Sequence, residues 1–207
     1  MKLLRNIVRK TLCELAELDF AATIPWESYQ TRYEDWEKGV ILAWGGLLHL
    51  GYHDLPENGN WAPRYKLIDE FKQAWNHRDD EEWFEDWQDW ITDMPPRFKD
   101  GTILFDKRIL TLTFKKIAAK SPVKEPIFIH RGVDDKAHFG GWNSWSAIAP
   151  SSNYYDRQHF VSYKILPGAE VIFGHGIADD YEVIANITDL INQGLAEEIT
   201  DPASSGE

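Results

Sequence analysis

The chain has 207 residues, of which 43% are hydrophobic and 27% charged, and its formal net charge is −12. This length and composition predict a globular protein of one domain or two small ones that needs no disulfide or metal ion to fold. There is no stretch of about 18 apolar residues and the first residues are interrupted by Arg5, Arg9 and Lys10, so we expect neither a transmembrane helix nor a signal peptide.

The charge balance and the cysteine count narrow the classes of partner. The 22 basic residues are outnumbered by 34 acidic ones and do not cluster, which makes nucleic acid an unlikely partner and favours a basic partner or simple solubility.

Cys13 is the single cysteine of the chain, which excludes an internal disulfide and suits a reducing cytoplasm. His49 and His53 have a helical metal-ligand spacing but no glutamate follows His49, and we predict no metal site.

The first part of the chain has a helical pattern. Apolar residues recur at three- and four-residue spacing, which predicts helices over 3–18, 25–50, 64–75 and 79–93 and a further one within 109–117. Eight of the ten tryptophans precede residue 91. The segment 79–93 combines tryptophans with many acids, which indicates a core face backed by a solvated acidic face or, alternatively, a docking surface for a basic partner.

After residue 120 the pattern becomes that of strands. Short apolar or alternating runs predict strands at 127–130, 142–146, 160–166, 170–173 and 181–187, followed by a short helix at 189–194. We therefore expect an α+β protein with a helical, Trp-rich, acidic region over 1–120, a β-rich core over 121–200 and a disordered tail over 201–207.

Three short motifs follow one another in the predicted β-rich core. Their central positions are Arg131-Gly132 after an apolar strand, Ser144-Trp145-Ser146 on the next strand, and Asp180-Tyr181-Glu182 at the start of a later strand. In each of the last two motifs the polar residues are two positions apart, so they face the same side of a strand. Each motif alone is common in surface turns and strands, and the order with its strand context carries the functional information.

This order resembles the arginine–serine–glutamate class of mono-ADP-ribosyltransferases over residues 127–188. The chain differs from that family by Trp145 between the serines, by Asp180 where the first glutamate is usual, and by only 12 residues between Arg131 and Ser144. The resemblance implies a split β-sandwich core that binds NAD as a substrate.

The resemblance also implies which residues bind NAD. Arg131 would hold the phosphates with two parallel hydrogen bonds, and Gly132 would let the backbone approach closely. Flat aromatic rings suit contact with nicotinamide, although both tryptophans suit a core or a cleft wall equally well. The implied NAD-binding residues are His130, Arg131, Gly132, Trp142, Trp145 and Ser146.

The implied catalytic residues are Glu182, Ser144 and Asp180. Glu182 would stabilise the positive charge that develops on the ribose when nicotinamide leaves. Ser144 would hydrogen-bond Glu182 and fix its rotamer, and Asp180 would engage the acceptor, for which a carboxylate suits an arginine.

The expected function is therefore transfer of ADP-ribose from NAD to a protein target in the cytoplasm, as an effector or a phage-type modifier would perform it. Two alternatives stay open. One is an NAD-hydrolysing toxin with the same cleft, and the other is a non-catalytic, acidic, Trp-rich protein that binds or inhibits a basic partner.

Overall fold

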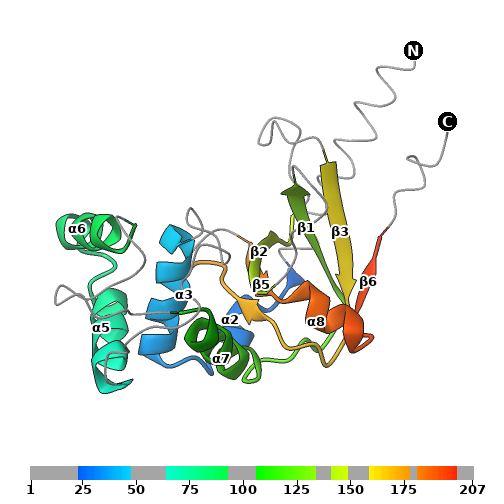
Figure 1. Ribbon diagram of the computed structural model, residues 1–207, viewed down its shortest axis with the longest axis horizontal. Helices are drawn as coiled ribbons and strands as arrows, with labels where there is room; N and C mark the ends of the chain where they lie inside the picture. The colour runs from blue at the N-terminus through cyan, green and yellow to red at the C-terminus, as the bar shows by residue number, and fades with distance from the viewer. Residues whose placement is uncertain are drawn as a thin grey trace, which may run out of the picture.

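The computed structural model describes residues 23–47, 64–92, 106–133, 141–148, 159–177 and 181–199. Several features singled out in the sequence lie outside the described residues, namely Cys13, His49, His53, Asp180, the predicted helix 3–18 and the tail 201–207. The described part is an α+β structure in which helices come first and a curled antiparallel sheet follows (Figure 1).

The helices before residue 120 are α2 Trp26–Gln30, α3 Asp35–Leu47, α5 Arg64–Asn76, α6 Glu81–Thr92 and α7 Lys107–Ala118. Figure 1 shows α3, α5 and α6 gathered on one side of the molecule, with β1, β3 and β6 on the other. Asp106 caps α7 by accepting a hydrogen bond from the Ile109 amide at 2.8 Å. No helix among the described residues is long and apolar enough to cross a membrane.

The helix predicted over 25–50 is two helices. A turn at residues 31–34 separates α2 from α3, and the Glu34 amide donates to the Glu37 carboxylate at 2.8 Å, which is one half of a capping box. The two helices serve different cores, since Trp26 of α2 packs with the sheet while Trp36 of α3 packs with the other helices. Because the chain turns between α2 and α3, the apolar residues of the continuous pattern over 25–50 contribute to both cores.

Helix α3 is held closely by its neighbours. A Cβ at Gly39 would lie 1.9 Å from the Phe71 carbonyl oxygen of α5, so only glycine permits this approach. On another side, the Lys120 ammonium, just after α7, lies 2.5 Å from the fully buried Glu37 carboxylate. These contacts fix the helical layer against the segment that enters the sheet.

The sheet has the strand order β4-β5-β2-β1-β3-β6, and every neighbouring pair is antiparallel. Its strands are β1 Ile127–Val133, β2 Asn143–Ser146, β3 His159–Ile165, β4 Ile172–Phe173, β5 Glu182–Ala185 and β6 Ala196–Glu198. Strand β6 was not predicted because it is three residues long and two of them are exposed glutamates. Helix α8, Ile187–Asn192, begins two residues earlier than predicted because Asn186 caps it.

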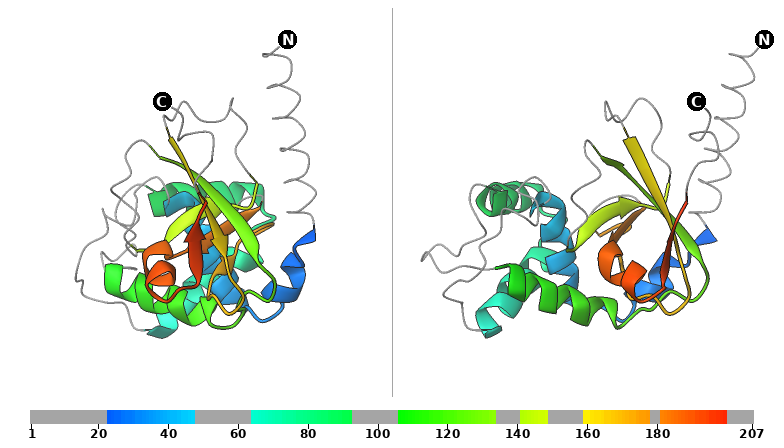
Figure 2. Two further views of the ribbon diagram at one scale, coloured as in Figure 1. Left: turned by 90° about the vertical axis from the view of Figure 1, so that its right-hand side faces the viewer. Right: turned by 45° about the vertical axis from the view of Figure 1, so that its right-hand side comes forward.

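Two hydrophobic cores lie against opposite faces of the sheet. The helix-side core joins α3, α5 and α7 to side chains such as Trp142, Ile172 and Ile184. The sheet-side core joins α2 and α8 to the alternate side chains of the same strands, among them Trp145 and Val183. Side chains alternate along a strand, so β5 contributes to both cores. The two views in Figure 2 show the twisted sheet with α2 and α8 close to it.

Candidate functional site

The centre of the candidate site is a carboxylate and a hydroxyl on neighbouring strands. Ser144 of β2 donates from Oγ to Oε1 of Glu182, the first residue of β5, at 2.5 Å. Glu182 is only 2% exposed. Burying a carboxylate costs free energy unless hydrogen bonds compensate, and a hydroxyl bond to a charged oxygen is of the strong kind. This is the hydrogen bond that the family resemblance implies.

A row of polar side chains extends from Glu182 across the sheet. Ser146 pairs with Glu182 across β2 and β5, His130 pairs with Ser146 across β1 and β2, and Ser162 pairs with His130 across β1 and β3. Directly paired residues point to the same face, so these four side chains share the face of Glu182. The row continues the face on which Ile184 packs into the helix-side core.

His130 is a neutral member of this row. Its Nδ1 and the Ser162 hydroxyl share a hydrogen bond of 2.8 Å, and its side chain is 8% exposed. Burial lowers the pKa of His130 from 6.5 to about 4, because desolvation disfavours the imidazolium. The buried Nε2 has no hydrogen-bond partner among the described residues.

Arg131 does not lie in this row. It is one residue from His130 and pairs with Val161, whose side chain belongs to the sheet-side core, so it is on the opposite face from Glu182. Its guanidinium donates to the Ser144 carbonyl oxygen at 3.1 Å and lies 6.0 Å from the centre of the Trp145 ring. The described structure thus brings Arg131 close to β2, but across the sheet from the carboxylate.

The remaining predicted NAD-binding residues are core residues. Trp142 is 5% exposed and meets Phe114 of α7 edge-on, while Trp145 is 2% exposed and meets Tyr163 edge-on. Their packing therefore favours the core alternative over contact with nicotinamide. Gly132 is buried within β1, where it pairs with Phe160.

A glycine that was not predicted shapes the pocket of the carboxylate. A Cβ at Gly174 would lie 2.9 Å from Glu182 Oε2, closer than two such atoms can approach. The Gly174 amide also donates to the Glu182 carbonyl at 2.9 Å. Because of this contact, the chain between β4 and β5 packs directly against the catalytic candidate.

The residue before Glu182 has an unusual backbone. Tyr181 has a φ of 59°, and no other non-glycine residue of the described part has a positive φ. A tyrosine in this left-handed region is strained, and such strain tends to occur at functional sites. The Tyr181 amide donates to Nδ1 of His175 at 2.8 Å, and their rings stack with centres 4.7 Å apart.

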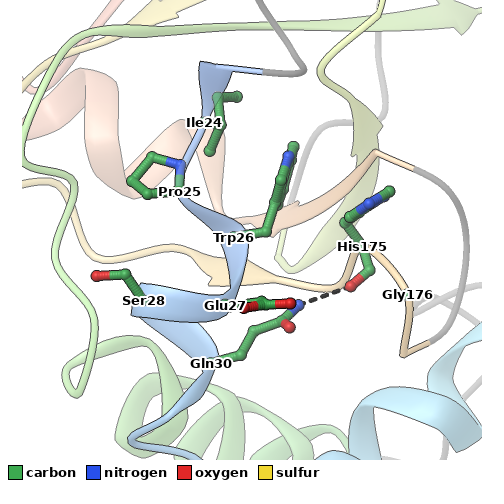
Figure 3. A pocket seen from close by; sticks show the side chains of 8 residues that line it. All are labelled: Ile24, Pro25, Trp26, Glu27, Ser28, Gln30, His175 and Gly176. Atoms are coloured by element: carbon green, nitrogen blue, oxygen red, sulfur yellow. Dashed lines mark hydrogen bonds between the residues drawn. The ribbon is translucent and has the colours of Figure 1, made fainter.

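A cavity of about 610 Å³ lies between α2 and the turn after β4. Figure 3 shows its lining, with Gln30 of α2 pointing toward the His175 carbonyl oxygen, to which it donates at 2.7 Å. None of the residues predicted from the sequence lines it; the lining residues are Ile24, Pro25, Trp26, Glu27, Ser28, Gln30, His175 and Gly176. The sequence signal that bears on it is His175, a histidine between two glycines, Gly174 and Gly176.

No group of three or more histidine, cysteine or acidic side chains in the described ranges is arranged to hold a metal ion. Comparisons with known protein families, curated proteins and solved structures find no significant match to this chain. The functional argument therefore depends on the geometry around Glu182.

Proposed function

We propose that the chain cleaves NAD at the bond between nicotinamide and ribose and transfers ADP-ribose to a protein. The single observation that carries this proposal is the buried Glu182 carboxylate, held by the Ser144 hydroxyl within a row of polar side chains. A polar row on a sheet face that is otherwise a core costs stability, and such costs are typical of functional sites.

In this reaction Glu182 acts on the ribose. Departure of nicotinamide leaves positive charge on the sugar, and a fixed carboxylate stabilises that charge with little reorganisation. The Ser144 hydrogen bond at 2.5 Å holds one oxygen of Glu182 in place. The close fit of Gly174 against Oε2 restricts the other oxygen. A carboxylate restricted on both sides is preorganised for this role.

The neighbours of Glu182 suit the ribose part of NAD. Ser146 stands next to Glu182 in the row, and the neutral His130 has an Nε2 that can bond a sugar hydroxyl. The phosphate contact of Arg131 stays a prediction, since that side chain lies on the other face of the sheet. In the described structure the guanidinium instead donates to the carbonyl oxygen of Ser144.

The acceptor is proposed to be an arginine of a protein with a basic surface. Asp180, which lies outside the described residues, would pair with the guanidinium and help to remove its proton. The net charge of −12 suits a basic target. If water reaches the ribose first, the same cleft hydrolyses NAD instead.

The test is incubation of the chain with labelled NAD and a cell lysate. Labelled protein bands support transfer, and free ADP-ribose without bands supports hydrolysis. No binding of NAD by the purified chain would overturn both and favour the non-catalytic alternative, for which the exposed acids of α6 and its preceding turn provide a surface.

The decisive variant is Glu182→Gln, which keeps the shape of the side chain and removes its charge. We expect cleavage of NAD to fall by about 10²–10³-fold, the usual cost of one preorganised electrostatic group. The matched control is Glu170→Gln, which changes an exposed glutamate near β4 and should leave the rate unchanged. Equal rates for the two variants would remove Glu182 from the reaction.

A further inference from the structure

We infer that His175 is a positioning residue that sets the direction of Glu182 through the backbone of Tyr181. The geometric part of this inference stands on the described contacts, and its catalytic consequence rests on the proposed function. The link between the histidine and the carboxylate is the hydrogen bond that His175 Nδ1 accepts from the amide of Tyr181, the residue before Glu182.

The strained backbone of Tyr181 is where β5 begins. With a φ of 59°, the chain turns sharply at this residue and then enters the strand at Glu182. Two hydrogen bonds to the backbone groups of Tyr181 hold the turn: its amide donates to the His175 side chain at Nδ1, at 2.8 Å, and its carbonyl accepts from the Ala147 amide at 2.9 Å. Strain of this kind persists only where surrounding contacts enforce it.

His175 is itself fixed from α2. Gln30 donates from its amide nitrogen to the carbonyl oxygens of Phe173 at 2.9 Å and His175 at 2.7 Å. The imidazole belongs to a cluster of three rings, with the Trp26 ring centre 5.0 Å away, the Tyr181 ring centre 4.7 Å away, and those two centres 6.3 Å from each other. Figure 3 shows Trp26 and Gln30 on α2 beside His175, with the Gln30 amide directed at the His175 carbonyl oxygen. The histidine is thus a fixed acceptor for a strained amide.

The hydrogen bond defines the chemical state of the ring. An Nδ1 that accepts a hydrogen bond from a backbone amide carries no proton, which places the ring proton on Nε2. The same turn also reaches Glu182 from the other side, since the Gly174 amide donates to the Glu182 carbonyl at 2.9 Å. Residues 174 and 175 therefore hold both ends of the peptide segment that carries the carboxylate.

Three substitutions at position 175 test this role. His175→Asn places an oxygen near the position of Nδ1 and keeps the acceptor, whereas His175→Gln offers one near Nε2 and His175→Ala offers none. We expect kcat for NAD cleavage to fall about tenfold in the Gln and Ala variants and to stay within about twofold of wild type in the Asn variant. KM for NAD should not change, because the inferred role of the histidine is to position Glu182 and not to bind NAD.

A readout without catalysis separates this inference from the proposed function. Nitrogen NMR should show the His175 proton on Nε2, and exchange of the Tyr181 amide proton should be slow in wild type and in His175→Asn but faster in His175→Ala. If wild type cleaves no NAD while these results hold, the proposed function fails and the positioning geometry stands. A proton on Nδ1, or equal loss of kcat in all three variants, would overturn the inference.

Discussion

The two faces of the sheet differ most at neighbouring positions of the same strands. On one face, Trp145 and Val183 pack fully into the sheet-side core. On the other, Ser146 and Glu182 stand in the polar row with His130. The helix-side core covers that second face at Ile172 and Ile184, so the polar row begins where the helices' apolar contacts end.

The difference indicates which residues serve stability and which serve chemistry. Apolar burial on the sheet-side face stabilises the fold in proportion to the area removed from water. The polar row does not stabilise the fold by apolar burial, and its buried polar groups need hydrogen bonds to offset the loss of their hydration. Substitutions on the sheet-side face should therefore reduce mainly the stability, whereas substitutions in the polar row should reduce mainly the activity.

The largest expected difference in stability is between alanine substitutions at two adjacent residues of β2, Trp145 and Ser146. Trp145→Ala should lower the free energy of unfolding by about 3–5 kcal/mol, because the ring is 2% exposed in the sheet-side core. Ser146→Ala should cost only about 0.5–1.5 kcal/mol, the loss of the hydrogen bond that its hydroxyl accepts from the Ile148 amide. Urea denaturation measures both, and equal losses would contradict the contrast between the faces.

The next effect comes from the buried histidine of the polar row. The pKa of His130 is about 4 in the folded state and 6.5 in the unfolded state. The unfolded chain therefore binds a proton first as the pH falls. The stability that the neutral histidine contributes is fully present above pH 6.5 and is lost as the pH falls toward 4. Between pH 7 and pH 5 the protonation of His130 should lower the free energy of unfolding by about 2 kcal/mol.

The matched variant for this prediction is His130→Asn, which keeps a group beside the Ser162 hydroxyl but does not titrate in this range. Urea unfolding at pH 7 and pH 5 should show a smaller acid loss in the variant than in wild type. The same acid loss in both proteins would mean that His130 binds its proton equally well in the folded and unfolded states.

A smaller and purely local effect is expected at Gly174. Gly174→Ala puts a methyl group 2.9 Å from Glu182 Oε2 and 3.4 Å from Glu182 Cβ, so the end of the glutamate side chain must shift to make room for it. We expect NAD cleavage to fall about tenfold while the free energy of unfolding changes by less than about 1 kcal/mol. Steady-state kinetics and urea denaturation of the same preparation measure both, and unchanged kinetics would show that the position of Oε2 is not critical.

The smallest effect on the folded chain is expected on α6, which lies on the other side of the molecule from β1 and β3 in Figure 1. Glu82→Lys with Asp86→Lys reverses two exposed charges and should change stability by less than about 0.5 kcal/mol, with NAD hydrolysis unaffected. If α6 docks a basic target, transfer to protein should slow at low salt and lose its salt dependence. Unchanged transfer at low salt would make this face a solvated surface only.

Much of the local structure is determined by the sequence alone. Helical spacing predicted α5 and α6 closely, because their apolar residues recur on one face, and alternation predicted β3. The separation of a helical first part from a strand-rich second part also follows from composition. The motif order predicts that Ser144 and Glu182 belong to one site, and the two side chains share a hydrogen bond.

Other features depend on contacts that are distant in the sequence. The chain breaks between α2 and α3 because the apolar residues of the two helices pack into different cores. Strand β6 forms only because Tyr163 and its neighbours in β3 provide a strand edge with which it can pair. Cross-strand register decides that His130 rather than Arg131 shares the face of Glu182, since a one-residue step on a strand reverses the side chain. The sequence places both residues together, and only pairing in three dimensions separates them.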